Sequence, residues 1–273
     1  MVSILGCGWL GLPLACHLIE KGISVKGSVT NADIFPILKE RGISPYQILL
    51  SPELSGDDLD GFFRCNILII NFPPERRLDI TTYHPAQIQS LIQAIIKYRI
   101  PKVLFISSTS VYPDVNREVF EYENLKPEKG SGQALKIVED LFREQKAFIT
   151  TIVRFGGLVG YDRLPGRFLA AKKDVANADA PVNIIHRDDC IEIIYRIIQQ
   201  EIWGEVFNAC ADEHPLRKNY YRQAAVLAGL EPPEFAENHH DVSFKIVNSD
   251  KLKKRLNYQF KYPDPIKMLG ADV

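Results

Sequence analysis

Val2-Ser-Ile-Leu-Gly-Cys-Gly-Trp-Leu-Gly11, at the start of the chain, carries the strongest structural signal in the sequence. The apolar run that closes with Ile4 and Leu5 is typical of a buried strand, and three glycines follow it with the spacing G-x-G-x-x-G. Apolar residues then recur at helical spacing until Gly22, and residues 23–29 have the composition of a second strand. The segment therefore predicts a strand, a tight turn, a helix and a second strand in direct succession.

Each glycine of this turn has a separate physical task. Gly6 permits a sharp turn out of the strand, Gly8 leaves room for a pyrophosphate beside the backbone, and Gly11 lets the helix pack closely against the sheet. The free N–H groups at the start of the helix, around Trp9 and Leu10, attract phosphate through their partial positive charge. The alternative is an ordinary glycine-rich turn, but the strand–helix–strand context favours binding of a dinucleotide.

Composition sets limits on the class of protein. The 273 residues have a formal net charge of -1, a pI near 6.6 and a hydrophobic content of 46%, enough for one sizeable core and a smaller second lobe. Nothing in this balance indicates a nucleic-acid or membrane partner, and no apolar run is long enough to span a bilayer. We therefore expect a soluble, cytoplasmic protein.

The cysteines and histidines give no sign of a metal site. The five cysteines stand at scattered positions without a C-x-x-C pair, so most are expected to be reduced thiols in the core. His239 and His240 form a lone pair in a polar stretch, where a solvated turn is the favoured interpretation.

Strand-like and helix-like segments alternate along the rest of the chain, which predicts an α/β fold with a parallel sheet. Strands are expected at residues 46–50, 67–70, 102–106, 148–153, 182–185 and 205–209. Helices are expected at residues 35–41, 57–63, 83–98, 132–145, 190–200, 216–230 and 250–256, and a surface loop at residues 113–129. Residues 1–155, with 182–209 returning to the core, are predicted to form a nucleotide-binding domain, and residues 156–181 and 210–273 a substrate-binding lobe.

Five motifs together resemble the short-chain dehydrogenase/reductase superfamily, and most closely its extended and atypical members, the NAD(P)-dependent epimerase/dehydratase-like proteins that act on nucleotide sugars. The motifs are residues 6–11, Ser107-Ser-Thr-Ser-Val-Tyr112, Lys136, Arg154-Phe-Gly-Gly-Leu-Val-Gly160 and Asn183-Ile-Ile-His-Arg-Asp-Asp189. The likeness covers nearly the whole chain. It implies a Rossmann-type doubly wound parallel sheet with a smaller C-terminal substrate lobe, in a monomer or a homodimer.

The resemblance also implies catalytic roles. Ser108, four residues before Tyr112, would orient the reacting oxygen, with a simple cap of the strand end as the alternative. Lys136 would hold the nicotinamide ribose. The family's proton relay is a tyrosine four residues before this lysine, and Gly132 stands there instead, so the Y-x-x-x-K motif is broken.

Three interpretations of the missing tyrosine remain open. Tyr112, or less plausibly Tyr161 or His186, could supply the proton, although an aromatic residue in the pocket wall is the favoured role for Tyr112. Ser131 could order a water molecule in the space that the tyrosine leaves. Alternatively, the protein binds its cofactor without redox chemistry.

The end of the second strand bears on the choice of cofactor. Proteins that bind NAD place an acidic residue there to bind the ribose hydroxyls. Here the end reads Ser28-Val-Thr-Asn31 without an acid, and Ser28, Thr30 and Asn31 could donate hydrogen bonds to a 2′-phosphate. No arginine stands there to clamp such a phosphate. The sequence therefore favours NADP modestly, with NAD as the alternative.

Further site residues follow from the resemblance. Cofactor contacts are expected at Asn71, Phe72, Pro73, Ser107, Phe155 and Gly156. Substrate contacts are expected at Thr109, Arg163, Arg167, His186 and Arg187. A cation there would suit a diphosphate or a carboxylate, and an ordinary surface position is the alternative for each arginine. Asp188 and Asp189 are expected to cap the helix that follows them.

Two functions are compatible with these predictions. The first is an NADP-preferring oxidoreductase or epimerase that acts on a small-molecule substrate of the sugar-nucleotide type by hydride transfer. The second is a dinucleotide-dependent sensor or scaffold that lost catalysis together with the tyrosine.

Overall fold

The computed structural model of the chain describes residues 1–236 and 242–270, and His239 and His240 lie outside the described residues. The chain divides into two compact units. The first comprises residues 1–111, 126–154 and 194–206, and the second comprises residues 112–125, 155–193 and 207–273. Neither unit is one continuous stretch, and the predicted substrate-binding role of the second unit remains a prediction.

An eight-stranded, mostly parallel sheet lies at the centre of the α/β fold and confirms the predicted fold class. In spatial order its strands are β11 (Val206–Ala209), β8 (Ile149–Phe155), β6 (Lys102–Ser108), β5 (Ile67–Ile70), β1 (Val2–Leu5), β2 (Val25–Val29), β3 (Ser44–Leu50) and β4 (Leu54–Gly56). β1 pairs in parallel with both β2 and β5, and β4 is an antiparallel addition beside β3. The strand order therefore reverses at β1, and doubly wound folds bind ligands at the carboxyl ends of the strands at such a reversal.

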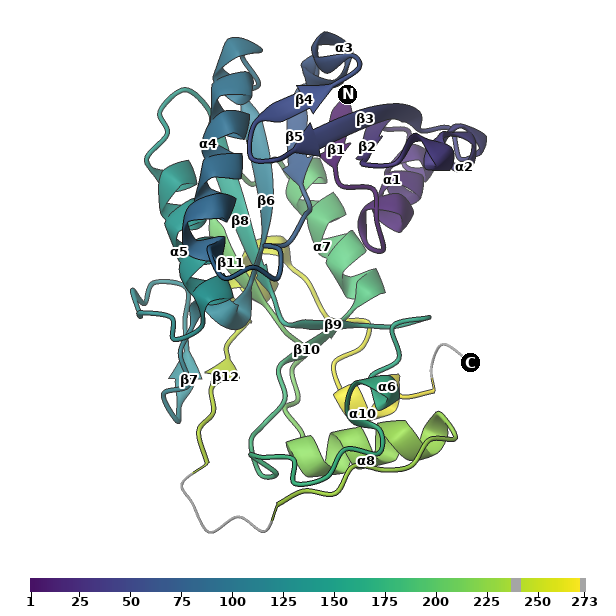
Figure 1. Cartoon of the computed structure of the whole chain (residues 1–273), viewed down its shortest axis with the longest axis vertical. Coiled ribbons are helices and arrows are strands. Elements are labelled where there is room, and N and C mark those ends of the chain that lie inside the picture. The colour runs from purple at the N-terminus through teal and green to yellow at the C-terminus, as the bar shows by residue number, and fades with distance from the viewer. Residues whose placement is uncertain (237–241, 271–273) are drawn as a thin grey trace. The chain divides into compact units, whose positions relative to one another are not determined.

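Helices cover the sheet of the first unit. They are α1 (Gly11–Glu20), α2 (Phe35–Glu40), α3 (Leu59–Phe63), α4 (Ile80–Lys97), α5 (Gly130–Arg143) and the second half of α7 (Arg187–Gln199), together with the 3-10 turns η1 (Ala32–Ile34) and η2 (Thr109–Val111). α4 and α5 pack side by side (Figure 1). All four residues of β5 are buried, as expected for an apolar strand that is covered on both faces.

The second unit has its own small sheets and core. β9 (Gly157–Val159) pairs in parallel with β10 (Ile184–His186), and β7 (Glu118–Val119) with β12 (Ile246–Val247). Its helices are α6 (Gly166–Leu169), α8 (Arg217–Leu227), α9 (Asp250–Leu256) and α10 (Pro265–Met268). One buried cluster joins β9, β10, α8 and α10, and it includes Val159, Ile184, Tyr220 and Met268.

The structure corrects several predicted element ends. α4 begins at Ile80, α5 at Gly130 and α7 at Arg187, each two or three residues earlier than expected. The predicted surface loop at residues 113–129 contains the strand β7, in which Glu118 is paired with Ile246. The local pattern could not reveal this strand, because its partner is distant in the chain. Among the described residues, no helix is both long enough and apolar enough to cross a membrane.

Candidate functional site

The glycine turn between β1 and α1 has the geometry of a phosphate-binding turn. Gly6 has a φ angle of +104°, and a β-carbon there would lie 2.4 Å from the Asn71 carbonyl oxygen. A β-carbon on Gly11 would lie 2.1 Å from the Gly6 carbonyl oxygen, because α1 starts directly against the turn. Gly8 is exposed, and a β-carbon on it would meet no described atom within 4 Å. Two glycines therefore close the turn, and the third leaves open space beside the backbone, as expected for a dinucleotide-binding turn.

Two side chains brace this turn. The Ser28 hydroxyl accepts a hydrogen bond from the Gly6 amide at 3.1 Å, and the Asn71 side chain donates one to the Gly6 carbonyl oxygen at 2.9 Å. Ser28 is only 2% exposed, so it shapes the turn, and this burial is at odds with the predicted contact between Ser28 and a 2′-phosphate. Cys7 is a buried free thiol, as expected, and burial raises its pKa to about 12.

An acidic residue lies close to the carboxyl end of β2, just beyond the four residues on which the cofactor prediction was based. Asn31 accepts a hydrogen bond from the Asp33 amide at 3.0 Å, and its Nδ2 donates to the Asp33 carboxylate at 3.1 Å. Thr30, Asn31 and Asp33 are all exposed. A carboxylate in this region suits ribose hydroxyls and repels a 2′-phosphate, so Asp33 weakens the predicted preference for NADP.

A buried ion pair that the sequence reading missed lies beside the end of β6. The carboxylate of Glu139 on α5 accepts hydrogen bonds from the Arg154 Nε at 3.0 and 3.1 Å. Glu139 is fully buried and Arg154 is 2% exposed. The Ser107 hydroxyl donates to the same carboxylate at 2.6 Å, so this predicted cofactor residue is tied into the network. The sequence did contain a signal for this pair: Glu139 stands on the apolar stripe of its helix, and Arg154 lies between Val153 and Phe155 in a buried strand.

Ser108 and Thr109 follow at the carboxyl end of the same strand. The Ser108 Oγ accepts a hydrogen bond from the Ser110 amide at 3.2 Å. Ser108 acts as the acceptor in this bond, and its hydroxyl can still donate to a ligand oxygen. Ser108 is half-buried, whereas Thr109 is only 7% exposed. Of the two hydroxyls, Ser108 is therefore the better placed to meet a ligand.

Lys136 and Gly132 both depart from the arrangement that the resemblance implies. The Lys136 Nζ donates to both oxygens of Asp140, one helical turn further along α5, at 2.6 and 2.7 Å. Gly132 is buried, and a β-carbon there would lie 2.2 Å from the carbonyl oxygen of Ser110. The main chain of Ser110 therefore leaves no room for the side chain of a tyrosine to start at position 132. Ser131, the alternative water-ordering residue, is exposed.

The segment after β5 presents the predicted residues Phe72 and Pro73. The Phe72 ring meets His84 of α4 edge to face, with the centroids 5.5 Å apart. Phe72 is half-buried and Pro73 is exposed. The ring of Phe72 therefore fixes the start of this segment against α4, while Pro73 lies at the surface.

In the second unit, Phe155 and Gly156 are buried. A β-carbon on Gly156 would lie 2.6 Å from the Cys210 Sγ and 2.8 Å from the Asn183 carbonyl oxygen, so this glycine serves close packing. Tyr112 is 3% exposed, and its hydroxyl contacts the Asn208 Oδ1 at 2.8 Å and the Phe120 carbonyl oxygen at 3.1 Å. These contacts favour the packing role of Tyr112 over proton transfer.

The predicted substrate residues of the second unit differ in exposure. His186 is 1% exposed and packs against Tyr262, with 3.9 Å between the ring centroids and the rings tilted by 41°. The Arg187 guanidinium lies over the ring of Tyr161 at 3.9 Å. Arg163 and Arg167 are exposed. Arg187 is half-buried, and His186 belongs to a packed aromatic group, so only Arg163 and Arg167 of this set lie at the surface.

The two aspartates at the start of α7 do not cap it, and this corrects the prediction. The His186 Nδ1 accepts the hydrogen bond from the Asp188 amide at 3.2 Å. The Asp189 carboxylate instead accepts from the Lys261 and Tyr262 amides at 2.7 and 3.1 Å. Asp189 therefore fixes the C-terminal segment, and desolvation raises its pKa despite these bonds.

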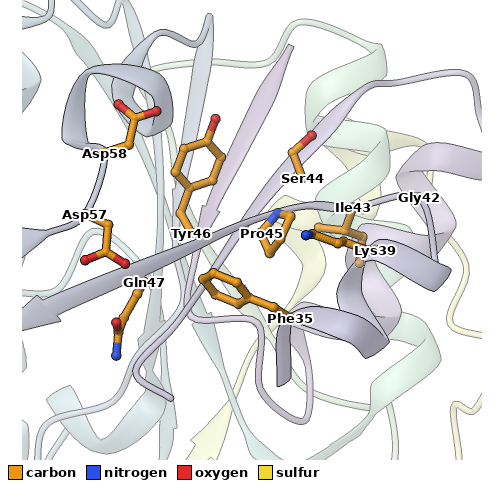
Figure 2. A pocket seen from close by; sticks show the side chains of 10 residues that line it. All are labelled: Phe35, Lys39, Gly42, Ile43, Ser44, Pro45, Tyr46, Gln47, Asp57 and Asp58. Atoms are coloured by element: carbon orange, nitrogen blue, oxygen red, sulfur yellow. The ribbon is translucent and has the colours of Figure 1, made fainter. Parts of the chain in front are cut away.

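A surface hollow of about 590 Å³ lies over β3 in the first unit (Figure 2). Phe35 and Lys39 of α2 stand on one side of it, and Asp57 and Asp58 on the other (Figure 2). None of the predicted cofactor residues lines this hollow. Its charges are mixed, so it lacks the positive character that a diphosphate would require.

Residues 1–236 and 242–270 contain no cluster of His, Cys, Asp and Glu that could hold a metal ion.

Solved structures share this fold. A short-chain dehydrogenase/reductase superfamily protein from Agrobacterium tumefaciens with bound NAD matches with a TM-score of 0.79 and 18% identity, over 98% of this chain and 94% of that one. The UDP-glucose 4-epimerase from Thermotoga maritima with UDP-glucose matches with a TM-score of 0.77 and 18% identity, over 98% and 96% of the two chains. The chain thus shares the fold of these two proteins, as the resemblance implied.

A curated relative identifies the family. No family model matches the chain. Protein YeeZ of Escherichia coli (strain K12) is 36% identical over 269 residues, which cover 98% of this chain and 98% of YeeZ. The chain therefore belongs to the YeeZ family.

Proposed function

We propose that the protein binds a nicotinamide dinucleotide at the turn between β1 and α1 and uses it in an oxidoreductase or epimerase reaction. The observation that carries the proposal is the contrast within the turn: Gly6 and Gly11 have no room for a β-carbon, whereas Gly8 is open and exposed. Such a surface lets backbone N–H groups approach a pyrophosphate. The dinucleotide, when bound, supplies or accepts a hydride at the substrate carbon.

The chain's own residues would bind and orient the reactants. The backbone around Gly8 would hold the pyrophosphate, and Asn71 would keep the turn in its binding conformation through the Gly6 carbonyl. The half-buried Ser108 would donate its hydroxyl to the reacting oxygen. Lys136 would hold the ribose only after exchanging Asp140 for it. A positioned acid or base contributes about 10² to 10⁴ in rate, so the source of the proton decides how active this enzyme is.

A substrate of the sugar-nucleotide type is the finer part of the proposal. It is supported by the fold shared with the UDP-glucose 4-epimerase and by the exposed side chains of Arg163 and Arg167, which suit a diphosphate. Arg187 would act with them, held in place by its stacking on Tyr161.

A second function, dinucleotide binding without hydride transfer, is favoured by a separate observation. The backbone of Gly132 lies against Ser110, and Lys136 is paired with Asp140, so neither group of the family's catalytic pair is in place. Tyr112, the first substitute for the missing tyrosine, has its hydroxyl engaged with Asn208. Under this function the protein reports the cofactor's level or redox state to a partner.

Calorimetry with NADPH and NADH tests the binding step. The wild type should bind, and Gly8→Arg should abolish binding because its side chain fills the open space. Ser24→Arg is the matched control: it adds the same charge at an exposed position of the same strand–helix–strand unit and should bind normally. Equal binding by Gly8→Arg and the wild type would refute the site.

Turnover separates the two functions. The wild type is supplied with UDP-glucose and either NADP or NAD, and nicotinamide absorbance and sugar epimerisation are both followed. Steady turnover excludes the binding-only function. Binding of the dinucleotide without turnover across a panel of nucleotide sugars favours it. If turnover is seen, its loss in Tyr112→Phe with NADPH binding retained would identify Tyr112 as the acid.

A further inference from the structure

An apolar cavity of about 90 Å³ lies within the second unit, apart from the glycine turn. Its walls come from β9, α6, α8 and α10 and the segments that join them, and they include Val159, Leu164, Tyr220, Ala224, Leu227 and Met268. No Asp, Glu, Lys or Arg is among the described residues that line it, and its polar side chains are those of His186 and Tyr220. By volume it could hold roughly three water molecules, but an apolar lining favours a compact organic group over water.

The walls of the cavity are held apart by close backbone packing. A β-carbon on Gly166 would lie 2.3 Å from the Ala224 carbonyl oxygen, so α6 is seated directly on α8. Gly160 has a φ angle of +120°, and a β-carbon there would lie 2.5 Å from the His186 Nε2. Because these contacts leave little room for movement, the cavity does not collapse.

The hydroxyl group of Tyr220, in the cavity wall, lacks a hydrogen-bond partner among the described residues. Tyr220 is 0% exposed. A buried hydroxyl without a partner costs roughly 1 to 3 kcal/mol. Burial also raises the pKa of Tyr220, which keeps this group a neutral donor at physiological pH. The wall thus offers the Tyr220 hydroxyl as a donor within a largely apolar surface.

The cavity is accessible from the rim. Leu227 lines it and is 58% exposed, and Gly270 at another point of the lining is also exposed. A ligand can therefore enter without unfolding of α8.

We infer that this cavity is a binding site for a compact, uncharged alicyclic or aromatic group that carries one hydrogen-bond acceptor, such as a ketone or a cyclic ether, with Tyr220 as the donor. Charged groups are disfavoured because no Asp, Glu, Lys or Arg lines the cavity to compensate for their loss of hydration. The site does not rest on the proposed dinucleotide function, and its test uses no dinucleotide.

Methyl NMR of methionine-labelled protein gives a local readout. The chain has two methionines; Met268 lines the cavity, and Met1 is 50% exposed and serves as the internal control. Titration with cyclopentanone should shift the Met268 signal in a saturable way and leave Met1 unmoved. Cyclopentane should bind more weakly, and the cyclopentylammonium ion should not bind.

Variants identify the donor. Tyr220→Phe should weaken cyclopentanone binding about fivefold to tenfold, as expected for one neutral hydrogen bond, and should leave cyclopentane binding unchanged. Tyr221→Phe removes a hydroxyl from the next residue, which does not line the cavity, and should bind as the wild type. Ala228→Phe should abolish binding by filling the rim, which provides a second test if Tyr220→Phe does not fold.

Two results would overturn the inference. The first is a Met268 signal that does not respond to cyclopentanone, or that moves only in parallel with Met1. The second is a cyclopentanone affinity that is the same in the wild type, Tyr220→Phe and Ala228→Phe, each shown by circular dichroism to be folded.

Discussion

The backbone of Gly132 lies so close to Ser110 that a β-carbon at position 132 would be 2.2 Å from the Ser110 carbonyl oxygen. The side chain of Pro127 would be a further neighbour, at 3.1 Å. The helix α5 therefore starts directly against η2, and the place from which a catalytic tyrosine would extend is filled by main chain. Reintroducing tyrosine at this position cannot by itself restore the family's proton relay.

The first prediction concerns this contact. Gly132→Ala should lower the free energy of unfolding by about 1 to 3 kcal/mol, because the new methyl group must displace backbone. Gly130→Ala is the matched control in the same helix: its β-carbon would be 3.4 Å from the Ile80 Cγ2, an ordinary contact, and the variant should be as stable as the wild type or more so. Urea unfolding of both variants measures the difference. Equal stabilities of the two variants would mean that the backbone of η2 moves away from the new methyl group at little cost in free energy.

The second prediction concerns the buried pair of Glu139 and Arg154. Glu139→Leu should cost about 3 to 5 kcal/mol, because it leaves a buried guanidinium without its counter-charge. The double variant Glu139→Leu/Arg154→Met should recover most of this loss. As a control, Lys136→Met breaks the partly exposed pair with Asp140 and should cost only about 0.3 to 0.5 kcal/mol. If the double variant is as unstable as the single one, the unpaired charge of Arg154 is not the cause of the destabilisation.

The third prediction concerns the choice of cofactor. Asp33→Asn should raise the affinity for NADPH relative to NADH by roughly threefold, because an exposed like charge near the 2′-phosphate is worth up to about 1 kcal/mol. Asp57→Asn, which removes the same charge from the hollow over β3, should leave the ratio unchanged. Competitive titration of the two dinucleotides gives the ratio. No change in Asp33→Asn would place Asp33 away from the adenosine ribose.

The fourth prediction concerns pH. Burial lowers the pKa of both His84 and His214, and the Nε2 of His84 is buried without a partner among the described residues. Below a pH of about 6.5 the unfolded chain therefore binds protons that the folded chain does not. The two neutral histidines contribute their full stabilisation above this pH. As the pH drops below it, the free energy of unfolding should fall by up to about 1.4 kcal/mol per pH unit for each histidine.

The variant His84→Gln/His214→Gln isolates this effect. Its unfolding free energy should depend less steeply on pH between about 6.5 and 5 than that of the wild type, since the remaining carboxylates are common to both proteins. Parallel slopes for the two proteins would assign the pH dependence to other groups.

Local patterns predicted the fold class because the periodicity that marks a strand or a helix is visible within a few neighbouring residues. Alternation of apolar strands and helices predicted the parallel sheet, and the spacing of Gly6, Gly8 and Gly11 predicted the turn at which β1 meets α1. The two-residue strand β7 was missed because its stability comes from pairing with β12 rather than from its own residues.

The candidate site could be predicted only in outline. Motif matching placed Ser108 at the end of its strand and Lys136 on its helix, but it could not show that Lys136 is paired with Asp140. Asp33 was missed because its distance to the end of β2 depends on how Asn31 turns the chain. The roles of the individual site residues remain predictions, and the variants above test them.

The amino-acid sequence by itself determined where most strands and helices form and which turn lacks side chains. Both features depend on only a few neighbouring residues. Tertiary packing alone decided that Glu139 meets Arg154, that Ser110 closes the position of Gly132, and that Tyr220 borders an apolar cavity. Each of these depends on bringing together segments far apart in the chain, where burial changes what a charge, a hydroxyl or a missing β-carbon can do.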